Sequence, residues 1–462
     1  MDNDVKDTKQ KGGPPQVLVV GFIITILVGT LLLMLPISSQ SGESTFVVDA
    51  LFTATSAVCV TGLVVVNTAA HWSLFGKVVI ITCIQIGGLG FMTVVSMLFV
   101  LRNKRITLKN RLVMQEALSF KSTAGIVRFT RLIVKLTFII EGIGAFLLSF
   151  VFVPEYGLIK GIGFSIFHSI SAFCNAGFDI VGENSLMPYV GNGIVNFTII
   201  MLIIIGGLGY SVWLDSYEMI KTKLNSAEHF TWKQAFYKLS LHTKLVWILT
   251  IGLILTGFLF FFAVEYQNPL TLGELSLKDK IYASLFQSVS PRTAGFNTLP
   301  LADLTVASQL VTILLMFIGG SPAGTAGGIK TVTFGVVLIC AISVMQGRSS
   351  IVAFRKKISI DVILRALTVI VIALVIVIST LTALTLTQDA TFMEIFFETV
   401  SAFGTAGLTL GITGNLNIIG KIIIILLMFI GRVGLFTIGV ALVARQGKIS
   451  QIQYPEEKVL IG

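Results

Sequence analysis

Four copies of one short phrase divide this chain of 462 residues into similar quarters. Each copy is a run of about a dozen apolar and small residues that closes with a glycine and a following apolar residue. The closing glycines are Gly62, Gly177, Gly295 and Gly407, and their successive separations are 115 (62 to 177), 118 (177 to 295) and 112 residues (295 to 407). A near-constant spacing indicates an internal repeat. Four repeats in one chain predict four quarters around a common axis.

The composition indicates that these quarters lie in a membrane. Hydrophobic residues make up 54% of the chain and charged residues only 12%, whereas soluble domains carry about 25% charged residues. We therefore predict an integral membrane protein. Most of the Lys and Arg residues fall at the termini or between the repeats, and the positive-inside rule assigns such segments to the cytoplasm. The net charge of +10 thus indicates membrane topology, and we expect membrane lipid and no nucleic acid as a partner.

Enzymes and cofactor-binding proteins are disfavoured by the residue types present. Cys59, Cys83, Cys174 and Cys340 lie in apolar stretches without a CxxC or Cys/His ligand spacing, so neither a disulfide scaffold nor a zinc site is supported. The chain has only four histidines and no HExxH motif. We predict that it is not an enzyme and that it binds no cofactor.

Each quarter has the order span, short apolar segment, span. The middle segment is too short to cross a hydrocarbon core of ~30 Å, which needs ~20 helical residues, so it is predicted to dip in from the outside and return. The predicted fold is all-α and integral to the membrane, with four consecutive span–pore-loop–span units arranged pseudo-fourfold around one central pore. The predicted segments are a cytoplasmic N-terminal tail (1–16), pore unit 1 (17–101), a basic cytoplasmic loop (102–131), pore unit 2 (132–214), a basic cytoplasmic loop (215–244), pore unit 3 (245–344), a cytoplasmic loop (345–361), pore unit 4 (362–445) and a C-terminal tail (446–462).

The repeated phrase has the chemistry of a cation-binding backbone. Non-helical backbone at membrane depth is tolerated where it is buried in protein or lines a water-filled cavity. Glycine lets carbonyl groups from neighbouring quarters approach closely, and rings of such carbonyls can replace the hydration shell of an ion. The preceding short helix directs its partially negative C-terminus toward the axis. A packing or turn glycine explains a single copy equally well, but not four copies at constant spacing.

The predicted ion-binding residues are the four tetrapeptides that close the phrases. Only the glycine is common to all four, as expected if backbone carbonyls bind the ion. The third phrase is one residue shorter from its serine to its glycine and contains Pro291, so the quarters are predicted to be unequal. The predicted filter residues are Cys59, Val60, Thr61 and Gly62; Cys174, Asn175, Ala176 and Gly177; Arg292, Thr293, Ala294 and Gly295; and Gly404, Thr405, Ala406 and Gly407.

The last span of the third quarter is interrupted by a stretch rich in glycine, serine and threonine. Its Gly-Ile-Lys order departs from the adjacent Gly-Lys-Ser/Thr of a nucleotide-binding loop, so we interpret it as a gate at 319–330. Ionisable groups in a membrane usually face the bundle interior, and Lys330 and Arg432 are predicted to repel cations while this loop is closed. A structural salt bridge of either residue with Glu398 or Glu141 is the alternative. The predicted gate residues are Gly319, Gly320, Ser321, Gly324, Thr325, Gly327, Gly328, Lys330 and Arg432.

These motifs together resemble the Trk/Ktr/HKT superfamily of potassium transporters. The match consists of the four units, one glycine per filter, the broken span with Lys330, and Arg432 in the last span. The length is closest to the membrane, ion-translocating subunit of a bacterial Ktr-type potassium uptake system. Gly62 is similar to the potassium-selective members, since sodium-selective plant relatives have serine at that position.

The resemblance implies a function and partners that composition does not give. It implies potassium uptake through a carbonyl-lined filter, with K⁺ bound at the filter residues, the loop as an intramembrane gate and Na⁺ as an activator. It also implies a homodimer on a cytoplasmic ring of nucleotide-binding regulatory subunits that sense ATP and ADP. The expected location is the plasma membrane of a bacterium, with several spans and both termini in the cytoplasm.

A secondary transporter that couples a solute or cation to H⁺ or Na⁺ by alternating access is the alternative function. Such transporters also contain broken helices, but they typically have inverted repeats and intramembrane acids. Here each repeat begins on the same side, and intramembrane carboxylates are few, with Glu141 the clearest. The sequence leaves open whether permeation is channel-like or coupled to another ion.

Overall fold

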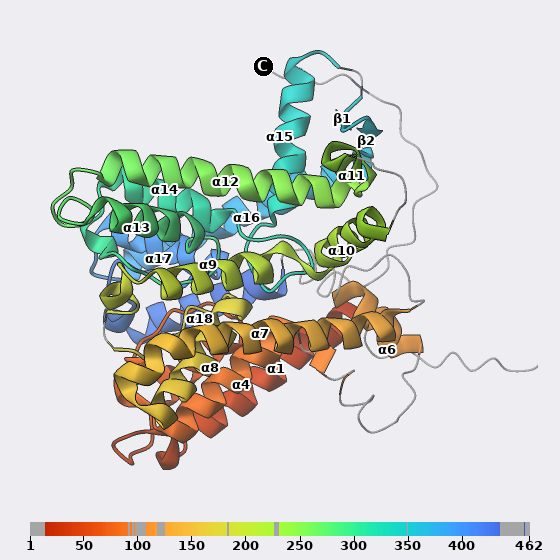
Figure 1. The fold of residues 1–462 in the computed structure, drawn as a ribbon. Coiled ribbons are helices and arrows are strands. Elements are labelled where there is room, and N and C mark those ends of the chain that lie inside the picture. Colours follow the sequence, from red (N-terminus) through yellow and green to blue (C-terminus); the bar gives the residue numbers. More distant parts are fainter. Residues whose placement is uncertain are drawn as a thin grey trace, which may run out of the picture.

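The computed structural model describes residues 14–90, 108–117, 125–182, 184–225, 231–348 and 350–434, together with positions 93, 94, 97 and 457. Its regular structure is almost entirely helical, and most helices run roughly along one direction (Figure 1). The exception among the described residues is one antiparallel hairpin of β1 (Val352–Ala353) and β2 (Lys356–Lys357). Apart from this hairpin, the predicted helical membrane class is confirmed.

A sequence of three helices recurs four times along the chain. The first is long, the second is short and ends near the phrase glycine, and the third follows an outer connection. The long helices are α1 (Pro14–Leu33), α7 (Ile126–Tyr156), α12 (Leu241–Glu265) and α16 (Ile360–Thr387). The short helices are α2 (Val47–Val58), α8 (Leu158–Cys174), α13 (Leu277–Val289) and α17 (Phe392–Gly404). The third helices are α4 (Leu74–Leu89), α9 (Gly193–Leu208), α14 (Val306–Phe317) and α18 (Ile418–Val433).

The remaining described elements are short or lie between the quarters. They are α3 (Thr68–His71), α6 (Leu108–Ala117), α10 (Tyr210–Asn225), α11 (Trp232–Lys238) and α15 (Thr331–Met345), with 3-10 helices at Pro36–Ser38, Met187–Tyr189, Leu301–Asp303 and Thr413–Asn415. The intervals predicted as loops are therefore partly structured. The predicted loop at 102–131 contains α6 and the start of α7, the one at 215–244 contains most of α10 and all of α11, and the one at 345–361 contains the hairpin. The predicted tails fall almost entirely outside the described residues.

Helix length separates the elements that can cross a membrane from those that cannot. Among the described residues, four helices are long and apolar enough to cross, namely α1, α7, α12 and α16. The helices α9 and α10 pass the same test only when they are taken together, and they are bent by 98° at the break between them. The short helices have 12, 17, 13 and 13 residues. At 1.5 Å per residue they reach only about 18 to 26 Å, which is less than the ~30 Å of a hydrocarbon core.

The third helices end earlier than the predicted spans, and glycine is the reason. Spans were predicted to continue to about 101, 214 and 444, but α4, α9 and α18 end before Gly90, Gly209 and Gly434. Each of these glycines has a positive φ (+83°, +90° and +91°), and a residue in such a conformation ends a right-handed helix. After Gly209 the chain turns by 98° into α10. Most residues that follow Gly90 and Gly434 lie outside the described part of the chain.

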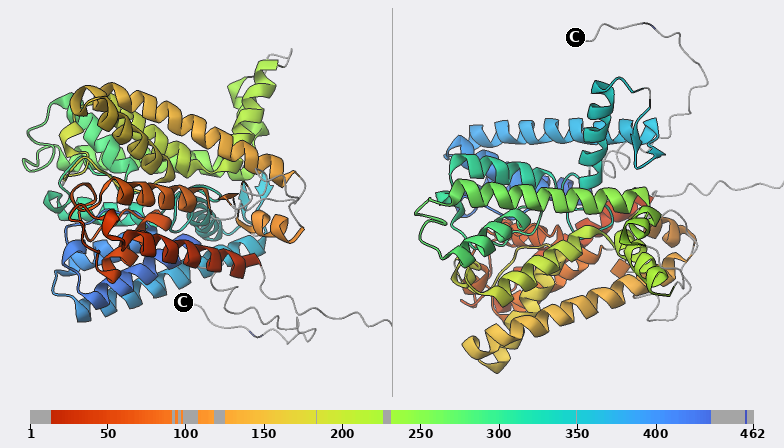
Figure 2. Two further views of the ribbon diagram at one scale, coloured as in Figure 1. Left: turned by 90° about the horizontal axis from the view of Figure 1, so that it is seen from below. Right: turned by 45° about the horizontal axis from the view of Figure 1, so that its top comes forward.

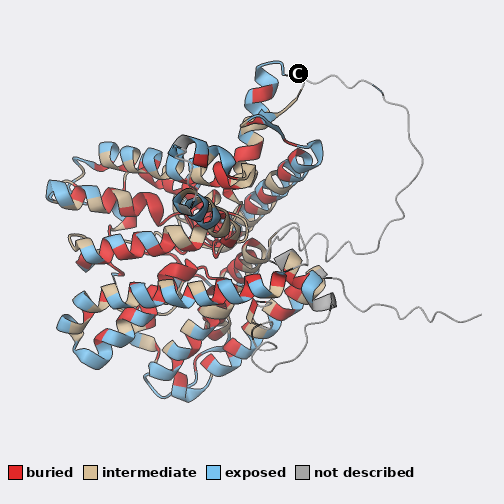
Figure 3. Cartoon of the chain, turned by 45° about the vertical axis from the view of Figure 1, so that its right-hand side comes forward, coloured by how far each residue is buried: buried red, intermediate tan, exposed pale blue. Residues whose placement is uncertain are grey.

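The surface of the bundle is apolar and its centre contains polar groups, which is the reverse of a soluble protein. Large apolar side chains project outward from the long helices, as Phe138 (57% exposed), Leu259 (61%) and Val371 (58%) do. Buried residues line the inner sides of the helices, as Figure 3 shows, and they include the carboxylates Glu141 and Glu398. An apolar exterior of this extent fits contact with lipid.

The outer connection of the first quarter contains a half-buried histidine, His71. The His71 Nε2 atom lies 2.9 Å from Thr45 Oγ1, and the ring packs edge-on against Trp72. Burial lowers the pKa of His71, while the nearby Asp49 acts in the opposite direction. A histidine with a lowered pKa stabilises the fold above its unfolded pKa of ~6.5, and that stability is lost as pH falls through the folded pKa.

We therefore expect the thermal stability of the detergent-solubilised protein to fall between pH 7 and pH 5. Replacing His71 with Gln keeps a hydrogen-bonding group but removes the titration, so the variant is expected to lose less stability on acidification. Thermal unfolding followed by intrinsic fluorescence at each pH is the measurement. Equal pH slopes for the variant and the wild type would exclude His71 as the titrating group.

Candidate ion pathway

The structure brings the four phrase glycines together in the order of the chain. A Cβ added at Gly62 would lie 3.2 Å from the Cα of Gly177, and one at Gly177 would lie 2.7 Å from the Cα of Gly295. A Cβ at Gly295 would lie 3.3 Å from the Cα of Gly407, and one at Gly407 would lie 2.9 Å from the Cα of Gly62. The contacts thus form a closed ring. All four glycines have positive φ, between +68° and +95°.

The carbonyl oxygen of the residue before each glycine lies beside the preceding glycine of the ring. A Cβ at Gly62 would lie 2.5 Å from the oxygen of Ala176. The oxygens of Ala294, Ala406 and Thr61 stand in the same relation to the other three glycines. Four carbonyl groups from four quarters are therefore close to the glycine ring. Any side chain larger than hydrogen at these positions would displace them.

A second backbone feature repeats two residues before each glycine. Val60, Asn175, Thr293 and Thr405 all have positive φ, between +51° and +72°. Such a conformation is uncommon for residues other than glycine and costs of order 1–3 kcal/mol each. The same strained step in all four strands, including the shorter third one, indicates that the path of the backbone is the shared feature.

The serine of each phrase holds the strand to its short helix. The backbone N–H groups of Thr61, Ala176 and Ala406 donate to the carbonyls of Ser56, Ser171 and Ser401, each at 2.8 Å. In the third quarter, which lacks one residue, Ala294 N donates to Ser290 O at 2.9 Å. These serines were not among the predicted site residues. The sequence contained a signal for them, because serine is the one polar residue that all four phrases have at the same position.

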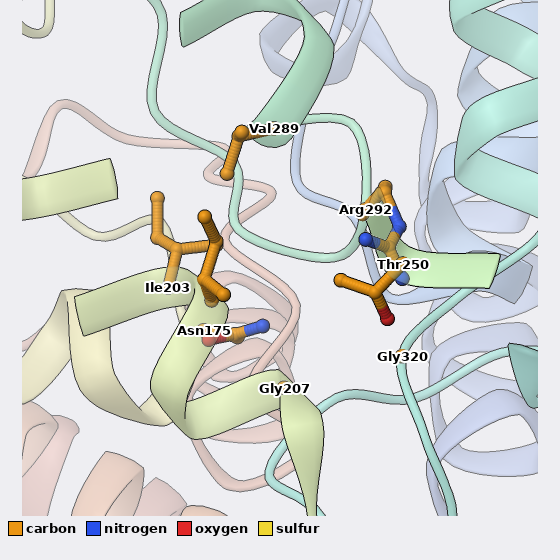
Figure 4. Close-up of a pocket in the computed structure, with 8 residues that line it drawn as sticks. Asn175, Ile203, Gly207, Thr250, Val289, Arg292 and Gly320 are labelled. Atoms are coloured by element: carbon orange, nitrogen blue, oxygen red, sulfur yellow. The ribbon is translucent and has the colours of Figure 1, made fainter. Parts of the chain in front are cut away.

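In the third quarter, the side chain of the predicted filter residue Arg292 points away from the glycine ring. Arg292 lines a cavity of about 10 Å³ together with Asn175, Ile203 and Thr250, which places its side chain against α9 and α12 (Figure 4). The Nε atom of Arg292 has no hydrogen-bond partner among the described residues. The cavity has room for about one water molecule. The backbone of Arg292 can therefore form part of the strand, while its guanidinium group lies on the side of the strand that faces α9 and α12.

Glycines in the third helices allow these helices to pack on the ends of the short helices. A Cβ added at Gly87 or Gly206 would collide with the carbonyl oxygens of Val58 and Phe173, respectively. Gly431 stands in the same relation to Phe403. In each of these three helices, one glycine thus allows close packing, and a later glycine, at 90, 209 or 434, follows the last helical residue with a positive φ.

The third quarter lacks a continuous third helix. The helix α14 ends at Phe317, α15 begins at Thr331, and residues 318–330 between them are not helical. The loop is closed at its base by a bridge between Ile318 and Ile329, where Gly319 N donates to Ile329 O at 2.9 Å. The helix α15 then leaves at a steep angle to the other helices (Figure 1).

The loop packs against strands and helices of two other quarters. A Cβ at Gly327 would collide with Thr405 Oγ1, and one at Gly328 would lie 3.1 Å from Gly404. Toward the second quarter, Ser321 N donates to Gly207 O at 2.9 Å and Thr325 Oγ1 donates to Phe173 O at 3.1 Å. The loop therefore lies directly against the fourth strand of the glycine ring and against the ends of α8 and α9 in the second quarter.

Arg432 connects this loop to the first quarter. One guanidinium nitrogen donates to Thr325 O in the loop, and the other donates to Gly87 O in α4. Lys330 Nζ donates to Ala326 O within the loop itself. Since Arg432 belongs to α18, this residue of the fourth quarter connects the loop of the third quarter to the first quarter.

The two cations do not form the salt bridges that were considered as an alternative. Their hydrogen-bond partners are backbone carbonyls, while Glu141 accepts from Gln85 Nε2 at 3.0 Å and Glu398 accepts from the hydroxyls of Thr409 and Thr413. Neither carboxylate lies within ion-pair distance of Lys330 or Arg432, and the ion pair recorded among the described residues joins Lys421 to Asp49 at 2.7 Å.

Resident metals and disulfides find no support in the described part of the chain. It contains no group of three or more His, Cys, Asp or Glu side chains that could hold a metal ion. All four cysteines are free.

Comparison with known proteins gives one consistent result. A protein-family model described as TrkH, cation transport protein, matches residues 10–452. The chain is 44% identical to the Ktr system potassium uptake protein B of Bacillus subtilis over 97% of both chains. It is 41% identical to the potassium/sodium uptake protein NtpJ of Enterococcus hirae over 99% of both.

A solved structure supports the same arrangement of helices. The potassium transporter TrkH from Vibrio parahaemolyticus superposes with a TM-score of 0.71 and 17% sequence identity, over 96% of this chain and 87% of that one. At this identity the likeness concerns the fold alone. Together with the family match, it agrees with the prediction of a membrane transport protein and not an enzyme.

Proposed function

Because the chain belongs to the TrkH family of cation transport proteins, we propose that it takes up potassium ions across the plasma membrane of a bacterium. The four glycine strands are the selectivity filter, and they surround a pore at the common axis of four quarters. The observation that carries this proposal is the closed ring of glycine contacts, with one carbonyl from each quarter beside it.

The chemistry of the ring fits a large monovalent cation. Backbone carbonyls can replace the hydration shell of K⁺ without any charged side chain. The short helices α2, α8, α13 and α17 end beside the ring with their C-termini, whose partial negative charge favours a cation. The side chains at the filter positions differ among the quarters, which a filter made of backbone tolerates. Alternating access by a secondary transporter receives no comparable support from the described contacts.

The loop at 318–330 is the gate of this proposed pathway. It packs against the fourth strand at Thr405 and the end of α8 at Phe173, and it is linked to α4 through Arg432. The charges of Lys330 and Arg432 beside it oppose a cation that has passed the ring. A glycine-rich segment can move without the steric cost that side chains impose.

The proposal extends to regulation and assembly. The Bacillus subtilis relative is named as one component of a Ktr system, and we propose a cytoplasmic nucleotide-binding subunit that senses ATP and ADP as the second component here. We also propose that the protein is a homodimer, as the resemblance implies. Both termini are proposed to lie in the cytoplasm, because the positive-inside rule assigns the basic segments that flank the spans to that side. Stimulation by Na⁺ is proposed because of the resemblance. The Enterococcus hirae relative is named for potassium and sodium, so Na⁺ is the competing ion to test.

Growth of a potassium-uptake-deficient bacterium at limiting K⁺ tests the proposed function. We expect the wild-type chain, expressed with the regulatory subunit encoded by its own host, to restore growth that depends on K⁺. Uptake of ⁸⁶Rb⁺ by the same cells gives the rate directly, and excess Na⁺ measures competition. Absence of uptake at any K⁺ concentration, with the protein present in the membrane, would contradict the proposal. Equal competition by Na⁺ would reassign the ion.

A further inference from the structure

The helix α10 leaves the end of α9 at nearly a right angle, and α11 follows it along the chain. The helix α9 belongs to a span, and α10 is bent by 98° from it. A helix perpendicular to a span lies in the plane of the bilayer. The helix α11 ends at Lys238, three residues before the long helix α12 begins. In the left view of Figure 2, α10, in yellow-green, projects from the side of the bundle near one end.

One face of α10 carries an exposed apolar stripe. Tyr217, Ile220 and Leu224 are 62%, 42% and 77% exposed, and positions i, i+3 and i+7 share one side of a helix. The opposite side packs on the start of α12, where Ser240 N donates to Asp215 Oδ2 at 3.0 Å. No described residue covers the stripe, which is therefore available to an apolar environment.

Lysines flank the stripe on both sides. At 3.6 residues per turn, Lys221 follows Tyr217 around the helix on one side and Lys223 follows Ile220 on the other. The Nζ atom of Lys223 lies 3.1 Å from the centre of the Trp232 ring at the start of α11. Trp232 and Tyr237 are themselves 65% and 56% exposed. One acidic residue, Glu218, is exposed on the same helix.

More basic residues adjoin α11 from another part of the chain. The Phe236 ring packs against Phe354 of the β1–β2 hairpin, with a centroid distance of 6.5 Å. Arg355, Lys356 and Lys357 on this hairpin are exposed. The surface thus combines apolar and aromatic side chains with lysines and arginine, a composition typical of helices that lie in the membrane interface.

We propose that the α10–α11 element lies in the cytoplasmic leaflet and binds the headgroups of anionic phospholipids, and that this binding controls the gate. Its apolar stripe enters the acyl-chain boundary, while Lys221 and Lys223 extend toward phosphate groups. The regulatory half of this inference rests on the proposed function. The occupant is lipid because an in-plane helix beside a span meets the bilayer in any case, and the flanking charges favour an anionic one.

The gate is directly attached to the start of α10. Tyr210 N donates to Ala323 O in the loop at 3.0 Å. Just before the bend, the carbonyls of Gly206 and Gly207 accept from Thr325 N and Ser321 N. A change in the tilt or depth of α10 is therefore transmitted to the loop through its backbone. No side chain needs to move for this coupling.

The position of the element can be measured without any transport. We expect lipids brominated near the headgroup, in vesicles that contain the reconstituted full chain, to quench the fluorescence of Trp232, and this part of the quenching to disappear in Trp232→Phe. The remaining tryptophans give the background in both proteins. Equal quenching of wild type and variant would overturn the placement in the interface.

The lipid specificity can be measured by flux of ⁸⁶Rb⁺ into vesicles of phosphatidylcholine with and without phosphatidylglycerol, in the absence of any partner protein. We expect the flux to change with phosphatidylglycerol. Because each lysine near an anionic surface contributes roughly fivefold to binding, Lys221→Gln/Lys223→Gln should need a severalfold higher phosphatidylglycerol fraction. The control is Lys278→Gln, an exposed lysine at the start of α13, next to the outer connections, which should respond like the wild type.

The outcomes separate this inference from the proposed function. A wild type without flux in any lipid would contradict the proposed function, whereas flux with the same lipid response in wild type and double variant would overturn only the lipid inference. If the double variant differed from the wild type solely when the regulatory subunit was added, the surface would be a protein-docking site. If it altered the dimer fraction in both lipids, the surface would be a contact between two copies.

Discussion

Replacing Gly62 with serine is expected to abolish K⁺-dependent growth at limiting K⁺ and to weaken the preference for K⁺ over Na⁺. The backbone at Gly62 has a φ of +95°, a conformation that side chains strain by about 1 to 3 kcal/mol. The new Cβ would also lie 2.5 Å from the carbonyl oxygen of Ala176, so this oxygen must move. Since about 1.4 kcal/mol corresponds to a factor of ten, we expect a roughly tenfold or larger loss of ⁸⁶Rb⁺ uptake relative to ²²Na⁺.

Two serine variants elsewhere separate the causes of this effect. Gly42 also has a positive φ (+73°), but nothing lies within 4 Å of a Cβ added there, and Gly163 in α8 has neither constraint. Both variants should transport like the wild type if crowding of the ring is the cause. Gly295→Ser, with a Cβ 2.9 Å from Ala406 O, should behave like Gly62→Ser. Full K⁺ preference in both ring variants would remove these strands from the filter.

The repeat made the glycine ring predictable from the sequence. Four phrases at constant spacing must occupy equivalent positions around an axis, and a residue present in all of them is the natural point of contact. The missing residue of the third phrase is also visible in the structure. The hydrogen bond from Ala294 N to Ser290 O spans one residue fewer than the equivalent bonds in the other three strands. The spacing thus predicted that the third quarter differs, whereas the hydrogen bond that accommodates the missing residue came from the structure.

Helix ends within the third helices were not predictable in the same way. The run around Gly87–Gly90 is as apolar as the rest of the span, so hydropathy gives no sign that the helix stops at Leu89. Whether a glycine permits packing or ends a helix depends on its φ, which tertiary contacts decide. Gly87 and Gly90 lie in one motif, yet the first packs on Val58 and the second takes a positive φ.

The partners of the intramembrane cations were also beyond sequence reasoning. An ionisable group in a membrane pairs with another charge or with backbone carbonyls, and the alternative considered from the sequence was a salt bridge with Glu141 or Glu398. The structure satisfies Arg432 with two carbonyls instead. These carbonyls are free because the loop is not helical and because Gly87 lies in the last turn of α4, where carbonyls have no intrahelical donor. Such partners depend on where helices end, which was the feature that the sequence concealed.

Replacing Arg432 with glutamine is expected to raise the flux of ⁸⁶Rb⁺ through the reconstituted protein in the absence of a regulatory subunit. The shorter, neutral side chain cannot hold both Thr325 O and Gly87 O, and each charge-assisted hydrogen bond that is lost contributes about 1.5 to 3 kcal/mol. The loop is then released from α4, and a positive charge that opposes cations below the ring is removed. A loss of about 1.5 kcal/mol from the closed state corresponds to a roughly tenfold higher flux.

Lys421→Gln is the matched control, because it removes a cation from the outer end of the same helix and breaks the ion pair with Asp49 of the first quarter. This variant also loosens a contact between α18 and the first quarter, but it leaves the loop untouched, so its flux should stay close to that of the wild type. An increase in Arg432→Gln alone would therefore assign the effect to the loop. An equal increase in both variants would attribute it to weaker packing of α18, and an unchanged or lower flux in folded Arg432→Gln would contradict a gate held closed by Arg432.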